Sequence, residues 1–402
     1  MVFSIRGDIA DALRADFRIN AEQFGVALTP AFWGFTLSAI FGGSLVDFFG
    51  MRRLLLLSAF GYIAAVLAIF LAPRPAAEVT PYYSDMGFRV LWSAMLMLGL
   101  SQGLVEGVIN PLCATMYPKE KTHKLNVLHA WWPGGLIIGG LAAFAITKIM
   151  GLDASGAGGQ ATFGWQLKLG LIMIPAVIYA VMIWKESFPQ TERVAAGIST
   201  GDMFKECLKP MFILWWVCMW MTASTELGPD QWVPSLITSS TGMQGILILV
   251  YTAGIMFVLR FFGGRLAHAL SPLGLLTISA VLSGLGLFGL SGISTAAGAF
   301  GAATLYGVGK TFFWPLMLGV TSERFPKSGA LGLAIMGGTG NLAVAFILPI
   351  MGGWYDKFGA AATFRYVAVL PVILTVIFAA LYFYYKARGG YKAVDLGKAA
   401  AR

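Results

Sequence analysis

The segment Gly43-Ser-Leu-Val-Asp-Phe-Phe-Gly-Met-Arg-Arg53 joins two long apolar runs of the chain, 24–49 and 53–73. Its spacing is G-x-L-x-D-x-x-G-x-R-R, with a small residue where helices can approach, an acid, a turn glycine and two arginines. Each flanking run exceeds the about 20 residues that a helix needs to cross a bilayer. The segment therefore predicts a polar turn between two membrane-spanning helices.

Gly43, Asp47, Gly50, Arg52 and Arg53 can do more than turn the chain. Gly43 allows close helix packing, and Asp47 can accept hydrogen bonds or pair with an arginine at the inner membrane surface. We predict a gating latch here, which breaks when the protein opens toward the cytoplasm. The alternative is a plain solvated turn.

The whole chain has a membrane composition. Of its 402 residues, 57% are hydrophobic and only 12% are charged, against about a quarter charged in a soluble protein. Its mean hydropathy is +0.75. At about 33 residues for a helix and its loop, the length allows about 12 spans. A large soluble domain is excluded.

Polar interruptions divide the chain into eleven apolar runs, and the longest interruption, 185–209, follows the fifth run. We predict an all-α polytopic membrane protein with two pseudo-symmetric helix bundles. The N-terminal bundle takes residues 1–187, a cytoplasmic linker 188–208, the C-terminal bundle 209–390 and a cytoplasmic tail 391–402. The apolar runs are 24–49, 53–73, 88–116, 125–150, 165–187, 209–236, 242–268, 272–293, 296–322, 328–355 and 362–386.

An internal repeat explains the odd number of runs. Gly43–Asp47 ends the first run as Gly264–His268 ends the seventh, an offset of 264 − 43 = 221 residues. The same offset subtracted from Met211, near the start of the sixth run, gives −10. We therefore expect eleven spans of a twelve-span set, with residues 1–23 as the stub of a first helix and the loop after it.

The basic residues set the expected topology. With the 47–53 turn in the cytoplasm, 17 basic residues lie inside and nine outside, and Arg260 and Lys310 within spans complete the 28. This bias predicts a multi-pass protein of the cell (inner) membrane with a cytoplasmic C-terminus. The positive charge is scattered over short loops, so we expect lipid bilayer contact and no nucleic-acid partner.

The three cysteines, Cys113, Cys207 and Cys218, lie in or beside apolar runs without ligand spacing. We expect packing roles for them, no metal and no cofactor. No cluster of His, Asp and Cys has catalytic spacing, so the sequence does not predict an enzyme.

Glu106 lies in the middle of an apolar run, between Met95–Val105 and Gly107–Met116. A carboxyl at membrane depth loses hydration when charged, so it can take up and release a proton, and when ionised it accepts bonds from sugar hydroxyls. We predict proton coupling at Glu106. The alternative is a structural partner for a buried cation.

Polar side chains on the following run offer a binding surface. Asn126 and His129 are three residues apart and share a helix face, with Trp131, Trp132 and Pro133 directly after them. We predict that Asn126, His129 and Trp132 line a path for a solute. The alternatives are a helix cap for Asn126 and a structural interhelical bond for His129.

A second polar group surrounds Gly228-Pro229 in the sixth run. A proline at membrane depth breaks a helix where it borders a cavity, so we expect Glu226 on the solute path. For Asp230 a solvated place at the outer mouth is favoured, and Trp232 either contacts the solute or anchors the interface. We hypothesise that Arg260 and Lys310 pair with Glu226 and Glu106, which would make Arg260 a gating residue.

The Gly43–Arg53 segment resembles the signature loop of the major facilitator superfamily. Three further segments resemble its fucose/hexose:proton symporter branch: Glu106-Gly-Val-Ile-Asn110-Pro111, Leu125–His129 and Thr225–Trp232. The resemblance implies a proton-coupled sugar symporter that works by alternating access, with Glu106 as the proton-linked acid. It places Asn126, His129 and Glu226 near the sugar.

We predict a secondary active transporter for a monosaccharide or similar small polar solute, working with protons and as a monomer. Asn110, Trp232 and Lys310 complete the predicted substrate-binding residues. The sequence departs from the branch at two places. Pro133 stands where the branch has a more glycine-rich stretch, and the expected first helix is missing. The alternatives are an exporter of amphipathic drugs or lipids and a non-transporting membrane sensor or assembly partner.

Overall fold

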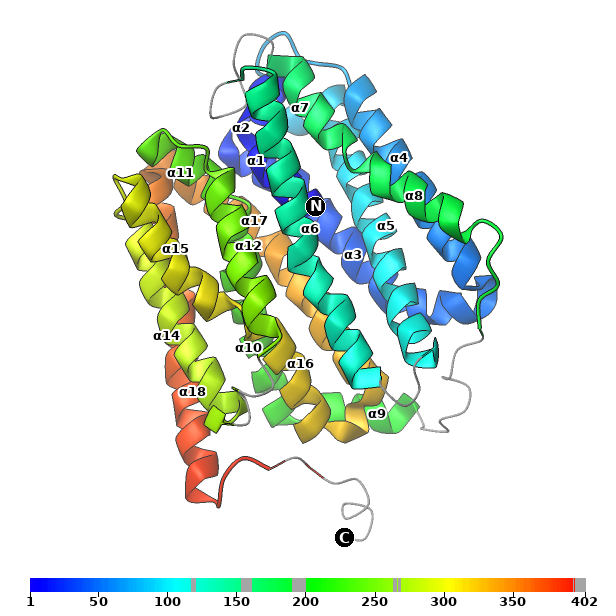
Figure 1. Cartoon of the computed structure of the whole chain (residues 1–402), viewed down its shortest axis with the longest axis vertical. Helices are drawn as coiled ribbons and strands as arrows, with labels where there is room; N and C mark the ends of the chain where they lie inside the picture. Colours follow the sequence, from blue (N-terminus) through cyan, green and yellow to red (C-terminus); the bar gives the residue numbers. More distant parts are fainter. Residues whose placement is uncertain are drawn as a thin grey trace.

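The computed structural model describes residues 1–116, 121–152, 161–189, 200–262, 266, 269–392 and 394. Within these ranges the regular structure is entirely helical, as predicted, and the long helices run side by side through the body (Figure 1). α9 and the C-terminal end of α18 (Val369–Ala387) lie at the lower end of the view, which we call the α9 end. The predicted topology places this end in the cytoplasm.

The first half of the chain begins with two short helices in the interior and continues with long ones. α1 and α2 bury Phe3, Ile5, Ile9 and Leu13, and α1 packs on α6, α7, α11 and α12. The helices are α1 (Val2–Asp8), α2 (Ala10–Phe17), α3 (Ala21–Phe49), α4 (Met51–Leu71), η1 (Tyr82–Ser84), α5 (Met86–Met116), α6 (Lys121–Ile149), α7 (Ala161–Gly170) and α8 (Met173–Ile183).

In the second half, interruptions at 231–232 and 311–312 divide spans into consecutive helices. Its helices are α9 (Thr200–Cys207), α10 (Pro210–Asp230), α11 (Val233–Thr241), α12 (Ile246–Arg260), α14 (Pro272–Leu290), α15 (Ala296–Lys310), α16 (Phe313–Arg324), η3 (Pro326–Ser328), α17 (Gly329–Val367) and α18 (Val369–Ala387). Helices α10–α18 gather on one side of the molecule and α3–α8 on the other (Figure 1).

Each predicted apolar run contains a helix or a pair of consecutive helices. Among the described residues, six segments are long and apolar enough to cross a membrane, and the last holds two consecutive helices. They are Met51–Leu71, Met86–Ile109, Leu128–Ile149, Gly164–Ile183, Pro272–Leu290 and Gly332–Ala387. The protein is thus a multi-pass membrane protein, while the count of eleven and the bundle boundaries stay predictions.

Glycines account for two of the sharp changes of direction. Gly50 has a φ of 81° between α3 and α4, so the predicted turn glycine is confirmed. Gly359 has a φ of 80° and ends the first straight part of α17, which places the last membrane crossing after it. An L-residue with a side chain is strained at such angles, so these positions favour glycine.

The two groups of helices meet along two crossings, α3 with α17 and α6 with α12. A Cβ added to Gly25 on α3 would lie 2.6 Å from the carbonyl oxygen of Leu348 on α17. The backbones therefore touch there. Two hydroxyls cross the same contact, because Thr29 Oγ1 donates to the carbonyl of Ala345 at 2.9 Å and Thr36 Oγ1 to that of Gly338 at 2.7 Å.

The chain after α18 is tied back to α16 at the α9 end. Tyr391 Oη donates to Glu323 Oε2 at 2.7 Å, and Arg324 Nη1 donates to the carbonyl of Lys392 at 2.7 Å. Burial and the neighbouring Glu323 carboxylate raise the pKa of Tyr391 above its ordinary value. The start of the predicted tail is therefore packed against the helices.

Candidate functional site

Two ion pairs lie inside the second group of helices. Lys310, the last residue of α15, places Nζ 2.5 Å from Asp230 Oδ1 at the end of α10, with side chains 0% and 3% exposed. Glu226 Oε1 lies 3.3 Å from Nη2 of Arg260, the last residue of α12. Glu226 and Asp230 are four residues apart and share a face of α10. We call these four residues the ion-pair cluster; its formal charges balance.

Interrupted helices hold the ion-pair cluster in place. Arg260 Nε donates to the carbonyl of Thr311, which lies between α15 and α16, at 3.2 Å. Tyr306 Oη donates to the carbonyls of Thr225 and Glu226 at 3.0 and 2.9 Å, and its ring lies 4.7 Å from Lys310 Nζ. Backbone carbonyls that precede a helix break or a proline lack the N–H group that would bond to them within the helix. Side chains can therefore donate hydrogen bonds to these carbonyls.

The cluster corrects two expectations and supports a third. Asp230 is 2% exposed and buried, so the solvated place at the outer mouth was wrong. Lys310 lies against Asp230, so the hypothesis that it pairs with Glu106 was wrong as well. The Arg260–Glu226 pair is confirmed. A buried cation is stable only beside a partner, and α10 supplies two acids one turn apart.

Gln231 and Trp232 follow the cluster, between α10 and α11. Trp232 is fully buried, stacks on Tyr355 of α17 with a centroid distance of 5.4 Å, and meets Phe24 of α3 edge-on at 6.1 Å. It is therefore not an interfacial anchor. Among the described residues, neither its indole N–H nor the side-chain amide of Gln231 has a hydrogen-bond partner.

The first group of helices holds a different pair of groups. His129 Nε2 on α6 lies 3.9 Å from Glu106 Oε1 on α5, and the side chains are 43% and 35% exposed. Two of the predicted residues thus lie together on facing helices. At this distance the contact is longer than a hydrogen bond.

Arg6, which lies on α1, was not predicted as a site residue. Arg6 is 2% exposed, and its guanidinium packs over the rings of Phe3 and Phe32 at 4.8 and 5.3 Å. Its Nε has no hydrogen-bond partner and no carboxylate lies within ion-pair distance, among the residues described. Trp132, a predicted binding residue, meets Phe3 edge-on at 5.7 Å. The signal in the sequence was an arginine among the apolar residues Val2, Phe3, Ile5 and Ile9.

The remaining predicted residues either lie at the surface or are described only by the helix that contains them. Arg52 and Arg53 begin α4 and are exposed. Four others lie within helices, but their side chains fall outside the described ones: Gly43 and Asp47 on α3, Asn110 on α5 and Asn126 on α6. The predicted latch and the roles of the two asparagines therefore stay predictions.

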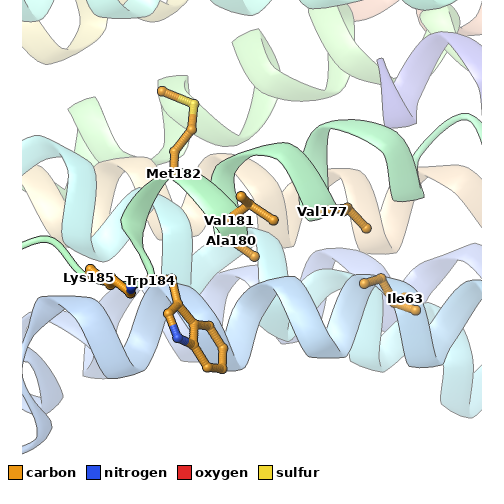
Figure 2. Close-up of a pocket in the computed structure, with 7 residues that line it drawn as sticks. All are labelled: Ile63, Val177, Ala180, Val181, Met182, Trp184 and Lys185. Atoms are coloured by element: carbon orange, nitrogen blue, oxygen red, sulfur yellow. The ribbon is translucent and has the colours of Figure 1, made fainter.

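An apolar groove of about 510 Å³ lies elsewhere, between α4 and α8. Figure 2 shows Ile63 on α4 near one end and Trp184 and Lys185 near the other. It contains none of the predicted site residues. Within the described part of the chain, no three His, Cys, Asp or Glu side chains gather as a metal site would require.

The long apolar helices form two groups, and charged side chains are buried among the helices. These features define a helical membrane protein of the kind that carries solutes across bilayers. Residues 7–330 match the family model of the Major Facilitator Superfamily, and the chain belongs to this family. The resemblance inferred from Gly43–Arg53 is thus confirmed.

Solved structures agree on the fold. A partially occluded inward-open xylose transporter XylE from E. coli superposes with a TM-score of 0.74 at 14% identity, covering 94% of both chains. A D-xylose–proton symporter gives 0.75 at 15% identity, over 94% of this chain and 93% of that one. The nucleoside transporter NupG gives 0.65 at 12%, over 95% and 96%. At such identities the likeness concerns the fold alone.

Curated relatives are more varied. A cis,cis-muconate transport protein of Acinetobacter baylyi is 23% identical over 288 residues, 66% of this chain and 63% of that protein. A probable chloroplastic anion transporter of Oryza sativa subsp. japonica is 30% identical over 132 residues, 32% of this chain and 23% of that protein. The chain thus spans less than two thirds of the length of these relatives.

Proposed function

We propose that the protein is a secondary active transporter that takes up a monosaccharide or similar small polar solute together with protons, by alternating access. Membership of the Major Facilitator Superfamily supports transport itself. The observation that carries proton coupling is the Glu106 carboxyl. It lies on the spanning helix α5, keeps about a third of its surface exposed and is close to His129.

Glu106 is suited to coupling because its carboxyl is partly exposed and lies near an imidazole. A carboxyl that is not sealed from its surroundings can exchange a proton, and when ionised it accepts hydrogen bonds from hydroxyls. The imidazole of His129, 3.9 Å away, is a second group that can carry a proton. Loading and unloading of this pair would tie solute binding to proton movement.

The polar surface for the solute is supported by groups with unused hydrogen-bonding capacity. The amide of Gln231 and the indole N–H of Trp232 are buried without partners among the described residues. A polyhydroxylated solute can both donate to and accept from such groups, and aromatic rings stack on its apolar face. Trp132 and Trp232 supply rings from the two groups of helices.

Uptake of labelled monosaccharides into cells that express the full chain tests this function. We expect uptake to collapse with an uncoupler and to be lost in Glu106→Gln, which keeps the size of the side chain but cannot exchange a proton. The matched control is Glu78→Gln, which changes an exposed acid outside the spans. Undiminished uptake in Glu106→Gln would remove Glu106 from the mechanism.

A second candidate function, transport of a small organic carboxylate, is favoured by Arg6. A buried guanidinium is costly unless an anion balances it, and the described residues place none within ion-pair distance. An arginine guanidinium can bind a carboxylate through two parallel hydrogen bonds. Relatives named for muconate and anion transport fit this candidate.

Competition separates the two candidates. If the solute is a carboxylate, an excess of small dicarboxylates should block uptake and monosaccharides should not. Arg6→Lys should then retain part of the uptake, since it keeps the charge, whereas Arg6→Gln should abolish it. Inhibition by sugars alone, with Arg6→Gln still active, would discard the carboxylate.

A further inference from the structure

The N-terminus of α3 shows how its free backbone donors are satisfied. The first N–H groups of a helix have no partner within the helix and need one from elsewhere. Asn20 and Gln23 cap each other, because Gln23 N–H donates to Asn20 Oδ1 at 2.8 Å and Asn20 N–H to Gln23 Oε1 at 3.0 Å. The N–H groups of Ala21 and Glu22 remain, and this local cap cannot reach them.

Asp356 satisfies both of these N–H groups from the other group of helices. The N–H of Ala21 donates to Asp356 Oδ1 at 3.2 Å, and the N–H of Glu22 donates to Oδ2 at 2.8 Å. Arg14 Nη2, at the end of α2, lies 3.9 Å from Oδ1. A negative charge at a helix N-terminus is also favoured by the helix dipole. The carboxylate on α17 therefore completes the cap of α3.

The backbones around this cap are in close contact. A Cβ on Gly352 would lie 2.4 Å from the carbonyl oxygen of Ala21, so α17 reaches α3 only because this residue is glycine. Toward the middle of the membrane, the contact of Gly25 with Leu348 and the Thr29–Ala345 hydrogen bond continue the same line. We call this line, from Asp356 to Ala345, the outer seam, since it lies toward the end opposite the α9 end.

We propose that Asp356 is the latch of an outer gate: its carboxylate holds α3 and α17 together along the outer seam, and this contact breaks whenever the protein opens on that side. When the seam separates, the N–H groups of Ala21 and Glu22 exchange the carboxylate for water. The closed state is thus favoured by two charge-assisted hydrogen bonds that the open state lacks. The proposal rests on the alternating-access cycle proposed above, but not on the identity of the solute.

A buried reporter on the outer seam tests the latch without any solute. Ala345 is 1% exposed, so in Ala345→Cys, with Cys113, Cys207 and Cys218 replaced by serine, a membrane-impermeant maleimide added from outside reacts only when the seam opens. Adding Asp356→Asn should raise the labelling rate about tenfold, because the amide loses the charge and one acceptor. An unchanged rate would overturn the proposal.

A charge control accompanies this measurement. Lys357→Gln changes the formal charge at the next position, which is exposed and has no hydrogen bond or ion pair among the described residues, and should leave the labelling rate unchanged. Arg14→Gln should raise the rate by less than Asp356→Asn, because its contact with the carboxylate is longer. Equal acceleration by all three changes would also overturn the latch.

A covalent lock gives a second test that does not depend on Asp356→Asn folding. A Cβ on Gly353 would meet the Glu22 side chain at 3.5 to 3.9 Å, so Glu22→Cys with Gly353→Cys can be bridged by an oxidant or a short bifunctional thiol reagent. Bridging should stop solute uptake and maleimide labelling of Ala345→Cys, and reduction should restore both. Labelling that persists in fully bridged protein contradicts the outer gate, whereas a wrong choice of solute affects the uptake assay alone.

Discussion

The ion-pair cluster and the Glu106–His129 pair hold their charges in opposite ways. In the cluster, two acids and two bases lie at distances of 2.5 and 3.3 Å, with side chains at most 14% exposed. Glu106 and His129, in the first half of the chain, stay 3.9 Å apart and are 35% and 43% exposed. Buried charges that satisfy one another hold a structure together, whereas partly exposed groups can exchange protons and bind solutes.

The largest effect on stability is expected from breaking the ion-pair cluster. Lys310→Met leaves Asp230 buried without its cation, and removing one partner of a buried pair costs about 3–5 kcal/mol. The thermal unfolding midpoint of the purified protein in detergent should fall sharply. Adding Asp230→Asn should recover much of the loss. Full stability of Lys310→Met alone would show that this site is not organised around its charges.

A smaller loss is expected from Tyr306→Phe. This change removes the hydroxyl that donates to the carbonyls of Thr225 and Glu226 but keeps the ring beside Lys310. A buried hydrogen bond of this kind contributes about 1 kcal/mol. The unfolding midpoint should drop measurably but less than in Lys310→Met. A loss as large as that of Lys310→Met would mean that Tyr306 organises the cluster.

The smallest loss of stability is expected from Glu106→Gln. Because its side chain is 35% exposed, neutralising it should change the free energy of unfolding by less than about 1 kcal/mol. The same variant is expected to lose uptake. A variant that unfolds as readily as Lys310→Met would place Glu106 among the structural charges and end the contrast between the two sites.

The positions of the helices could be predicted from the sequence because a membrane imposes a length on every span. The turn at 47–53 could be predicted as well, because it contains a glycine, and Gly50 does take a positive φ in the structure. Prolines also mark the positions where spans break. Pro229 lies beside the break between α10 and α11, and Pro315 follows the interruption between α15 and α16 at 311–312. Pro315 has no N–H to donate to the carbonyl of Thr311, which accepts from Arg260 instead.

Partners of the buried charges were the least predictable feature. Lys310 and Asp230 are 80 residues apart, so nothing local joins them. The spacing of four between Glu226 and Asp230 was available and indicates one helix face with two acids, which would have pointed to two cations nearby. The Asp356 cap was out of reach of sequence reasoning, because it joins residues more than 300 positions apart.

The balance of the ion-pair cluster has an electrical consequence. One elementary charge moved across the whole membrane exchanges about 2.3 kcal/mol with each 100 mV of membrane potential. A group of two acids and two bases carries no net charge when its helices tilt, so voltage does little work on it. Voltage dependence of the cycle should then come from Arg6, from the proton on Glu106 and from the charge of the solute. A measurement of transport current would report the charge carried by these three, with little contribution from the ion-pair cluster.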